Sequence, residues 1–186
     1  MEISCLLPND LTNSVKKATI KDEIVKEYTM NIQKIESFEV DHTRLVPGMY
    51  ISRVDGDVTT FDLRTRRPNA GDYMDNATMH TLEHLFATYI RNSNIGQAVL
   101  YFGPMGCQTG FYLLMRNTTP VTVYREVLAV LRKILSHEGE VFGASEVECG
   151  NYRNLTLEAA KTEAKRYLNI LEARGETDFS YEGERT

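Results

Sequence analysis

Apolar residues recur at helical spacing in three segments of the chain, and each segment is typical of an amphipathic helix. The three predicted helices cover residues 78–91, 122–136 and 155–173. A weaker pattern of the same kind, with many charged side chains, predicts a further helix at residues 16–27. After residue 173 the sequence becomes polar and loses its periodicity, so we expect a frayed tail over residues 174–186.

Segments rich in aromatic and β-branched residues are typical of strands. Residues 49–63 predict a hairpin, because Asp55-Gly56 favours a type I′ turn with positive φ at both central residues. Residues 98–102 and 110–117 predict two more strands. Clustered strands mixed with long helices predict an α+β fold, a single domain with a largely antiparallel β-sheet packed with helices.

Composition indicates one soluble globular domain and excludes several classes of protein. The 186 residues suffice for one hydrophobic core, and 42% of them are apolar and 25% charged. No stretch reaches the roughly 18 to 20 apolar residues of a membrane span. The first residues lack the features of a signal peptide, so we expect a cytoplasmic location. The net charge of −5, without basic runs interleaved with aromatic residues, argues against a nucleic-acid partner.

The strongest candidate for chemistry is the sequence His80-Thr81-Leu82-Glu83-His84 in the helix predicted to start at residue 78. Residues at i and i+4 share a helix face, so His80 and His84 can reach the same metal ion. Neutral imidazoles suit zinc, iron, nickel or copper better than magnesium or calcium. Glu83 lies beside them, where a carboxylate could act on a metal-bound group. Two surface histidines on an amphipathic helix would give the same pattern.

The three cysteines, Cys5, Cys107 and Cys149, are odd in number and widely spaced, which is not a disulfide framework in a reducing compartment. Cys107 lies in a glycine-rich turn that would leave its thiol accessible, and a nearby positive charge would lower the pKa of that thiol. Cys149 could complete a site of two histidines and one cysteine, which leaves a fourth position for water or substrate. Each cysteine could instead be an inert thiol.

Taken together, these motifs resemble the S-ribosylhomocysteine lyase family, known as LuxS. The resemblance runs from about residue 35 to about residue 171, in the family's order and at near-family spacing, and it sets off residues 1–34 as an N-terminal extension and 35–173 as the lyase domain. The matching segments are Ser37-Phe38-Glu39-Val40-Asp41-His42, Phe61-Asp62-Leu63-Arg64, Pro68-Asn69, His80-Thr81-Leu82-Glu83-His84, the sequence PMGCQTGFY from Pro104, and Cys149-Gly150.

The resemblance implies a role for each matching residue. Two residues match the catalytic acid/base groups of the family, Glu83 and Cys107. Three match the ligands of an iron(II) ion, for which zinc or cobalt can substitute: His80, His84 and Cys149. Three more match residues that line the substrate pocket and that come from the neighbouring chain of a homodimer: Ser37, His42 and Arg64.

The implied reaction cleaves S-ribosylhomocysteine to homocysteine and 4,5-dihydroxy-2,3-pentanedione, the precursor of autoinducer-2. The thioether is a poor leaving group until a carbonyl stands close enough to stabilise a carbanion beside it. Two aldose–ketose isomerisations move the carbonyl from C1 to C3, and a β-elimination follows. These steps require a Lewis acid and a base that returns the proton. By family analogy, Cys107 serves the isomerisations and Glu83 the later steps.

Two features depart from the family pattern. Family members usually have Ile-Asp-Ile-Ser before Pro-Met-Gly-Cys, whereas this chain has Leu100-Tyr101-Phe102-Gly103, so Tyr101 replaces an aspartate of the pocket. The chain also carries roughly 30 additional N-terminal residues, Cys5 among them.

Two other functions are compatible with the residues. The motif HxxEH also occurs in small zinc proteases of the inverzincin type, in which the glutamate is the general base. Such a protease would take its third ligand from a downstream carboxylate, for which the sequence offers Glu140, Glu146 and Glu148. The departures named above would also fit a catalytically inactive relative that binds a metal ion.

Overall fold

The computed structural model describes residues 34–176 and 178–181 and divides the chain into two units after Ile35. The fold described below is that of the second unit. The helix predicted at residues 16–27 and Cys5 lie outside the described residues, as does nearly all of the N-terminal extension.

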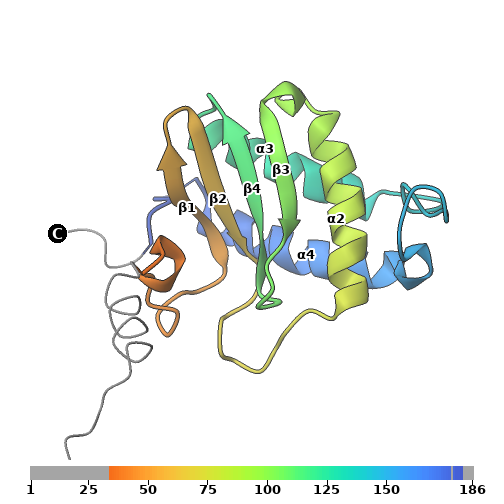
Figure 1. Ribbon diagram of the computed structural model, residues 1–186, viewed down its shortest axis with the longest axis horizontal. Coiled ribbons are helices and arrows are strands. Elements are labelled where there is room, and N and C mark those ends of the chain that lie inside the picture. Colours follow the sequence, from red (N-terminus) through yellow and green to blue (C-terminus); the bar gives the residue numbers. More distant parts are fainter. Residues whose placement is uncertain (1–33, 177, 182–186) are drawn as a thin grey trace, which may run out of the picture. The chain divides into compact units, whose positions relative to one another are not determined.

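The second unit combines one antiparallel sheet with three α-helices, which confirms the predicted α+β class. The strands lie in the order β1-β2-β4-β3 (Figure 1). No helix within the described part of the chain is long and apolar enough to cross a membrane. The elements are η1 (Glu36–Phe38), β1 (Gly48–Asp55), β2 (Val58–Arg64), α2 (Asn76–Arg91), η2 (Gly96–Ala98), β3 (Val99–Pro104), β4 (Gly110–Arg116), α3 (Pro120–Leu135), η3 (Tyr152–Asn154) and α4 (Leu157–Arg174).

Capping residues explain where the three helices begin and end. Helix α2 starts after Asp75, whose side chain accepts a hydrogen bond from the backbone N–H of Thr78 at 2.6 Å. Helix α3 starts after Thr119, with a proline at its first position, where no N–H is needed. Helix α4 ends at Arg174 and is capped by Gly175, whose φ of +72° suits glycine. These three predicted helices are confirmed, with each boundary shifted by no more than two residues.

The turn between β1 and β2 differs from the predicted type. Asp55 pairs with Val58, so the two loop residues are Gly56 and Asp57. Only Gly56 of these two has a positive φ, +61°. The predicted type I′ turn is therefore wrong. A positive φ at the first central residue alone is typical of a type II′ turn, in which glycine takes that position.

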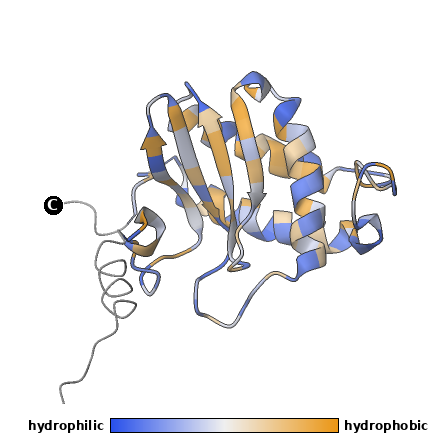
Figure 2. Cartoon of the chain, in the orientation of Figure 1, coloured by the Kyte–Doolittle hydropathy of each residue, from blue (hydrophilic) through white to orange (hydrophobic). Residues whose placement is uncertain are grey.

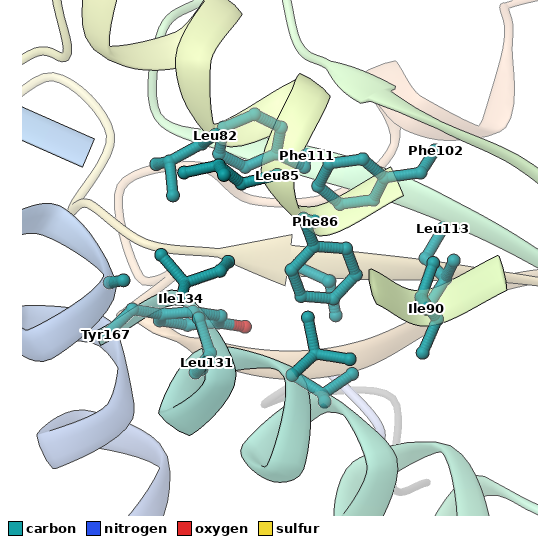
Figure 3. Close-up of a cluster of buried hydrophobic side chains, with 14 of the residues drawn as sticks. Leu82, Leu85, Phe86, Ile90, Phe102, Phe111, Leu113, Leu131, Ile134 and Tyr167 are labelled. Atoms are coloured by element: carbon teal, nitrogen blue, oxygen red, sulfur yellow. The ribbon is translucent and has the colours of Figure 1, made fainter. Parts of the chain in front are cut away.

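The helices cover one face of the sheet and form the core with it (Figure 1). Alternate strand residues point to that face, and Figure 2 shows hydrophobic residues along the strands and on the helices. Figure 3 shows the ring of Phe86 on α2 stacked against Phe102 on β3, with centroids 4.2 Å apart, and Phe102 stacked against Phe111 at 5.1 Å. This contact fixes the rotation of α2 about its axis, and with it the direction of the two histidines.

The opposite face of the sheet carries polar and half-exposed side chains. Cross-strand partners share a face, so the pairing of Asp62 with Tyr112 and of Tyr112 with Gly103 sets these residues on this second face. Leu100 is 40% exposed and Tyr101, also on β3, is 49% exposed. The candidate pocket residue Arg64 ends β2 on the same face.

The segment that follows α4 packs back onto the sheet. The backbone N–H of Ile51 donates to the carbonyl of Phe179 at 2.7 Å, and Tyr181 stacks on Tyr50 with centroids 5.1 Å apart. The side chain of Tyr181 is only 6% exposed. The expectation of a frayed tail is therefore wrong for Tyr181, because the polar pattern concealed two aromatic side chains with partners far away in the sequence.

A buried ion pair fastens the loop between β2 and α2 to helix α4. The Arg66 guanidinium donates to both carboxylate oxygens of Glu163, at 3.1 and 2.5 Å, and also contacts Asp72. Glu163 is only 3% exposed, so its charge depends on this partner. The loop leads directly to the histidine-bearing helix, so the ion pair helps to set the start of α2.

We expect Glu163→Ala to lower the free energy of unfolding by about 3 kcal/mol, because it leaves the Arg66 charge buried without its bidentate partner. Urea denaturation would measure the loss. Glu172→Ala on the same helix removes an exposed ion pair with Arg132 and should cost less than about 1 kcal/mol. Equal losses for the two variants would contradict a special role for Glu163.

Candidate metal centre and catalytic thiol

His80, His84 and Cys149 come together as predicted, although 65 residues separate the second histidine from the cysteine along the chain. One ligand atom from each lies within 4.8 Å of the others. Cys149 Sγ is 3.3 Å from His80 Nε2, and the two imidazoles meet edge to face with centroids 4.7 Å apart. Of the described histidines, cysteines and carboxylates, only these three form such a group.

Hydrogen bonding sets the tautomer of His84. Its Nδ1 lies 2.7 Å from the carbonyl oxygen of Phe142, and a carbonyl can only accept. Nδ1 therefore carries the hydrogen, and Nε2 is left with a lone pair for a metal ion. For His80, burial and then the neighbouring charge of His84 lower the pKa, which favours the neutral, ligating form.

The segment carrying Cys149 is fastened to helix α2 on both sides of the thiol. Before it, Phe142 accepts the hydrogen bond from His84. After it, the backbone N–H of Thr156 donates to the hydroxyl of Thr81 at 2.8 Å. The backbone N–H of Asn151 donates to Cys149 Sγ at 3.4 Å. The thiol is thus held beside the histidines by backbone contacts.

The donor set fits a transition-metal ion of the zinc or iron type. Tetrahedral bonds of about 2.0 Å to nitrogen and about 2.3 Å to sulfur separate such ligand atoms by roughly 3.5 Å, close to the observed 3.3 Å. Three protein ligands leave a coordination position for water or substrate. Glu83, partly buried, lies between the two histidines in the sequence, and its charge acts on His80.

Cys107 lies in the predicted tight turn between β3 and β4. The turn is closed by the Gln108 N–H, which donates to the Met105 carbonyl at 3.0 Å, and Gln108 takes a left-handed φ of +62°. The backbone of the turn also contacts the loop before α2, because the N–H of Met74 donates to the carbonyl of Gln108 at 3.1 Å. Cys107 is exposed, so its thiol is open to a substrate.

Thr109 and Arg64 make Cys107 more acidic than an ordinary thiol. Burial opposes ionisation, but the hydrogen bonds from Thr109 and the positive charge of Arg64 outweigh it and lower the pKa of Cys107. Thr109 Oγ1 is 3.0 Å from Cys107 Sγ, and Arg64 Nη1 is 3.7 Å from the same sulfur. Arg64 also donates to Thr109 Oγ1 at 2.5 Å, so the three side chains form one unit.

Two residues that hold Arg64 were not among the residues predicted for the site. Asp62 is 1% exposed and accepts from Arg64 Nη2 at 2.6 Å, and Tyr181 donates to the same carboxylate oxygen at 3.0 Å. Burial raises the pKa of Asp62, against the opposing effect of Arg64. The spacing of Asp62 and Arg64, two residues apart on one strand face, was a readable signal. Nothing in the local sequence points to Tyr181.

Of the remaining pocket candidates, His42 lies close enough to Asp62 for its charge to act on that carboxyl, and its Nδ1 is 2.8 Å from the Val40 carbonyl. Ser37, partly buried, lies in η1. Tyr101 folds over Gly103, where a methyl group would overlap the phenol. The two departures at Tyr101 and Gly103 are therefore linked, since the tyrosine needs the glycine.

Comparison with known proteins gives consistent matches. A family model described as S-Ribosylhomocysteinase (LuxS) matches residues 35–177. A protein of Finegoldia magna named S-ribosylhomocysteine lyase is 43% identical over 75% of this chain and 92% of its own length. Proteins of the same name from Clostridium beijerinckii and Borreliella afzelii are 44% and 40% identical, over 74% and 81% of this chain and 91% and 99% of their own lengths.

We expect Thr109→Val to raise the pKa of Cys107, because it removes the hydroxyl that donates a hydrogen bond to the thiolate. The same hydroxyl is also an acceptor that helps to hold Arg64 beside the sulfur. Less thiolate is then present near neutral pH, so iodoacetamide should alkylate Cys107 several-fold more slowly. The pH–rate profile of alkylation should shift to higher pH. Peptide mass spectrometry would separate Cys107 from the other cysteines. Thr60→Val, the same change on β2 four residues before Arg64, should leave the profile unaltered, and an unaltered profile in Thr109→Val would refute the assignment.

Proposed function

The chain belongs to the S-ribosylhomocysteinase (LuxS) family and is a lyase of S-ribosylhomocysteine, and we propose that it performs the cleavage with a metal ion held by His80, His84 and Cys149. The observation that carries the proposal is the gathering of these three ligand atoms within 4.8 Å of one another. We propose iron(II) as the resident ion, with zinc or cobalt as substitutes, since an N,N,S donor set accepts all three.

The chemistry follows from a carbonyl that must migrate along the sugar before the thioether can leave. A divalent ion at this centre would act as a Lewis acid toward the sugar oxygens. Cys107, with its lowered pKa, is suited to take a carbon-bound proton and return it one carbon along. We assign the later proton transfers, including the β-elimination, to Glu83. The products are homocysteine and 4,5-dihydroxy-2,3-pentanedione, and the latter is the precursor of autoinducer-2.

The donor atoms beside the two histidines do not fit a zinc protease of the inverzincin type. Such an enzyme would complete its site with a carboxylate, whereas the third ligand atom beside the histidines is the sulfur of Cys149. Glu148 is the candidate carboxylate that lies next to Cys149 in the sequence, and its side chain accepts a hydrogen bond from Ser145 Oγ at 2.6 Å. A protease would also have no use for a thiol activated by Thr109.

The open face of the sheet supports the proposal of a homodimer with shared pockets. This face bears the exposed side chains of Leu100 and Tyr101 and, beside them, the Arg64–Cys107 unit. An isologous dimer through this face would bury the apolar residues and set the pocket residues of one chain against the other chain. Because Arg64 contacts Cys107 within one chain, the same chain would contribute both residues to a shared pocket.

Metal content and thiol release test the metal centre and the catalytic thiol together. Purified protein should contain close to one iron, zinc or cobalt ion per chain, and His84→Ala should lose it. Cys107→Ala should keep its metal and its fold but release homocysteine at least about 100-fold more slowly, because a general acid/base is gone. Cys107→Ser should be almost as inactive. Loss of the metal in Cys107→Ala but not in Cys149→Ala would mean that the two thiols have exchanged roles, and a fully active Cys107→Ala would refute the mechanism.

Mixed dimers test whether Ser37, His42 and Arg64 come from the neighbouring chain. Co-expression of His84→Ala with His42→Ala should restore about one quarter of the wild-type activity, because half of the dimers are mixed and each has one intact site of two. Co-expression of His42→Ala with Arg64→Met should restore none, because both defects lie on the same side of the pocket. Absence of activity in the first mixture, with mixed dimers present, would contradict the shared pocket.

A further inference from the structure

The loop between α3 and Cys149 is fastened to helix α2 through a buried histidine that lies outside the metal site. His137 is 6% exposed, and its Nε2 lies 2.9 Å from the carbonyl oxygen of Glu140. Because that oxygen can only accept, Nε2 carries the hydrogen. Nδ1 is therefore the acceptor for the hydroxyl of Tyr89, 2.8 Å away on α2. Tyr89 follows the metal-ligand candidate His84 by five residues on the same helix.

Three rings form a cluster at this point. The ring of Phe142 meets His137 edge to face with centroids 4.9 Å apart and meets Tyr89 in the same manner at 5.2 Å. The rings of Tyr89 and His137 are 5.9 Å apart. Edge-to-face pairs are favourable and directional, so they restrain the side chain of Phe142, and with it the backbone of that residue.

The backbone of Phe142 is also the hydrogen-bond partner of the metal ligand. Its carbonyl accepts from His84 Nδ1 at 2.7 Å. The next residue, Gly143, lies so close that a Cβ there would be 3.2 Å from His84 Nδ1, and its φ is +70°. From there the chain reaches Cys149, whose N–H donates to the Ser145 carbonyl at 3.0 Å. A shift of Phe142 would therefore disturb both the orientation of His84 and the approach of the cysteine ligand.

We propose that Tyr89 and His137 are positioning residues for the metal centre, acting through the Phe142 carbonyl that orients His84. The inference rests on the proposed metal site and adds to it two residues that touch neither metal nor substrate. Partners of metal-bound histidines are worth about 10- to 100-fold in metal affinity. The Tyr89 hydroxyl on α2 thus contributes to metal affinity indirectly. It fixes the loop at Phe142, and the carbonyl of Phe142 orients the imidazole of His84.

A purely structural role for the cluster makes a different prediction. In that case removal of the Tyr89 hydroxyl would lower the free energy of unfolding without changing how fast the ion leaves. Tyr124 offers a matched control, because its buried hydroxyl donates to the Leu171 carbonyl at 2.7 Å, between α3 and α4. Tyr124→Phe removes the same hydrogen-bonded hydroxyl between two other helices, away from the loop that carries Cys149.

The experiment uses the full-length protein loaded with cobalt(II). The rate of cobalt loss to excess chelator and the visible spectrum of the bound ion are measured for wild type, Tyr89→Phe, His137→Gln, the double variant and Tyr124→Phe. We expect both single variants to lose cobalt about tenfold faster and to show altered visible bands. The double variant should be no faster than the singles, because both residues act through one link. Tyr124→Phe should lose cobalt at the wild-type rate.

Two results would overturn the inference in distinguishable ways. If wild type binds one cobalt ion per chain but Tyr89→Phe and His137→Gln release it at the wild-type rate, the cluster serves stability alone and the metal site stands. If wild type binds no cobalt, the metal centre itself fails and the positioning role fails with it. Unfolding curves measured on the same samples would show whether a variant has lost its fold, in which case the milder Tyr89→Phe, which keeps its ring, decides the question.

Discussion

The rotation of helix α2 is the constraint on which the rest of the site depends. Leu82, Leu85 and Phe86 are at most 4% exposed and anchor one side of the helix in the core. Once that side is buried, the period of about 3.6 residues leaves His80 and His84 no other direction than toward the flank of the core. A turn of the helix about its axis would cost the stacked contact between Phe86 and Phe102 and would also separate the two imidazoles from the cysteine.

Backbone contacts bring Cys149, the third candidate ligand, to this helix. The carbonyl of Phe142 and the N–H of Thr156 both bind side chains of α2, one on each side of Cys149 in the sequence. A ligand held in this way needs little side-chain reorganisation when an ion arrives, because its chain segment is already in place. The contact with the Phe142 carbonyl also fixes the tautomer of His84, so one hydrogen bond both positions the loop and leaves Nε2 free to bind a metal ion.

On the other face of the sheet, Arg64 and Thr109 form a second group of side chains with Cys107 and make its thiol more acidic. Arg64 is buried and pairs with Asp62 at 2.6 Å, so its guanidinium keeps a fixed direction. Its Nη1 group is aimed at both Thr109 Oγ1 and Cys107 Sγ, so the positive charge stabilises the thiolate where a fully solvated arginine would be screened. The candidate metal site and the thiol thus rely on different faces of one sheet, and the proposed dimer through the open face would join the pocket of one chain to its neighbour.

The sequence by itself predicted the secondary-structure elements and the candidate site residues. Periodicity predicted the helices, and the i, i+4 spacing of His80 and His84 predicted a shared ligand face, because both signals are local and follow from backbone geometry. It also singled out Cys107 and Cys149 through the family motifs. Only the tertiary structure decided the contacts between distant segments: Tyr181 on Asp62, Tyr89 on His137, and Phe142 on His84. These contacts depend on how the loops close over the packed core, and no local pattern records which distant backbone carbonyl or hydroxyl a side chain will meet.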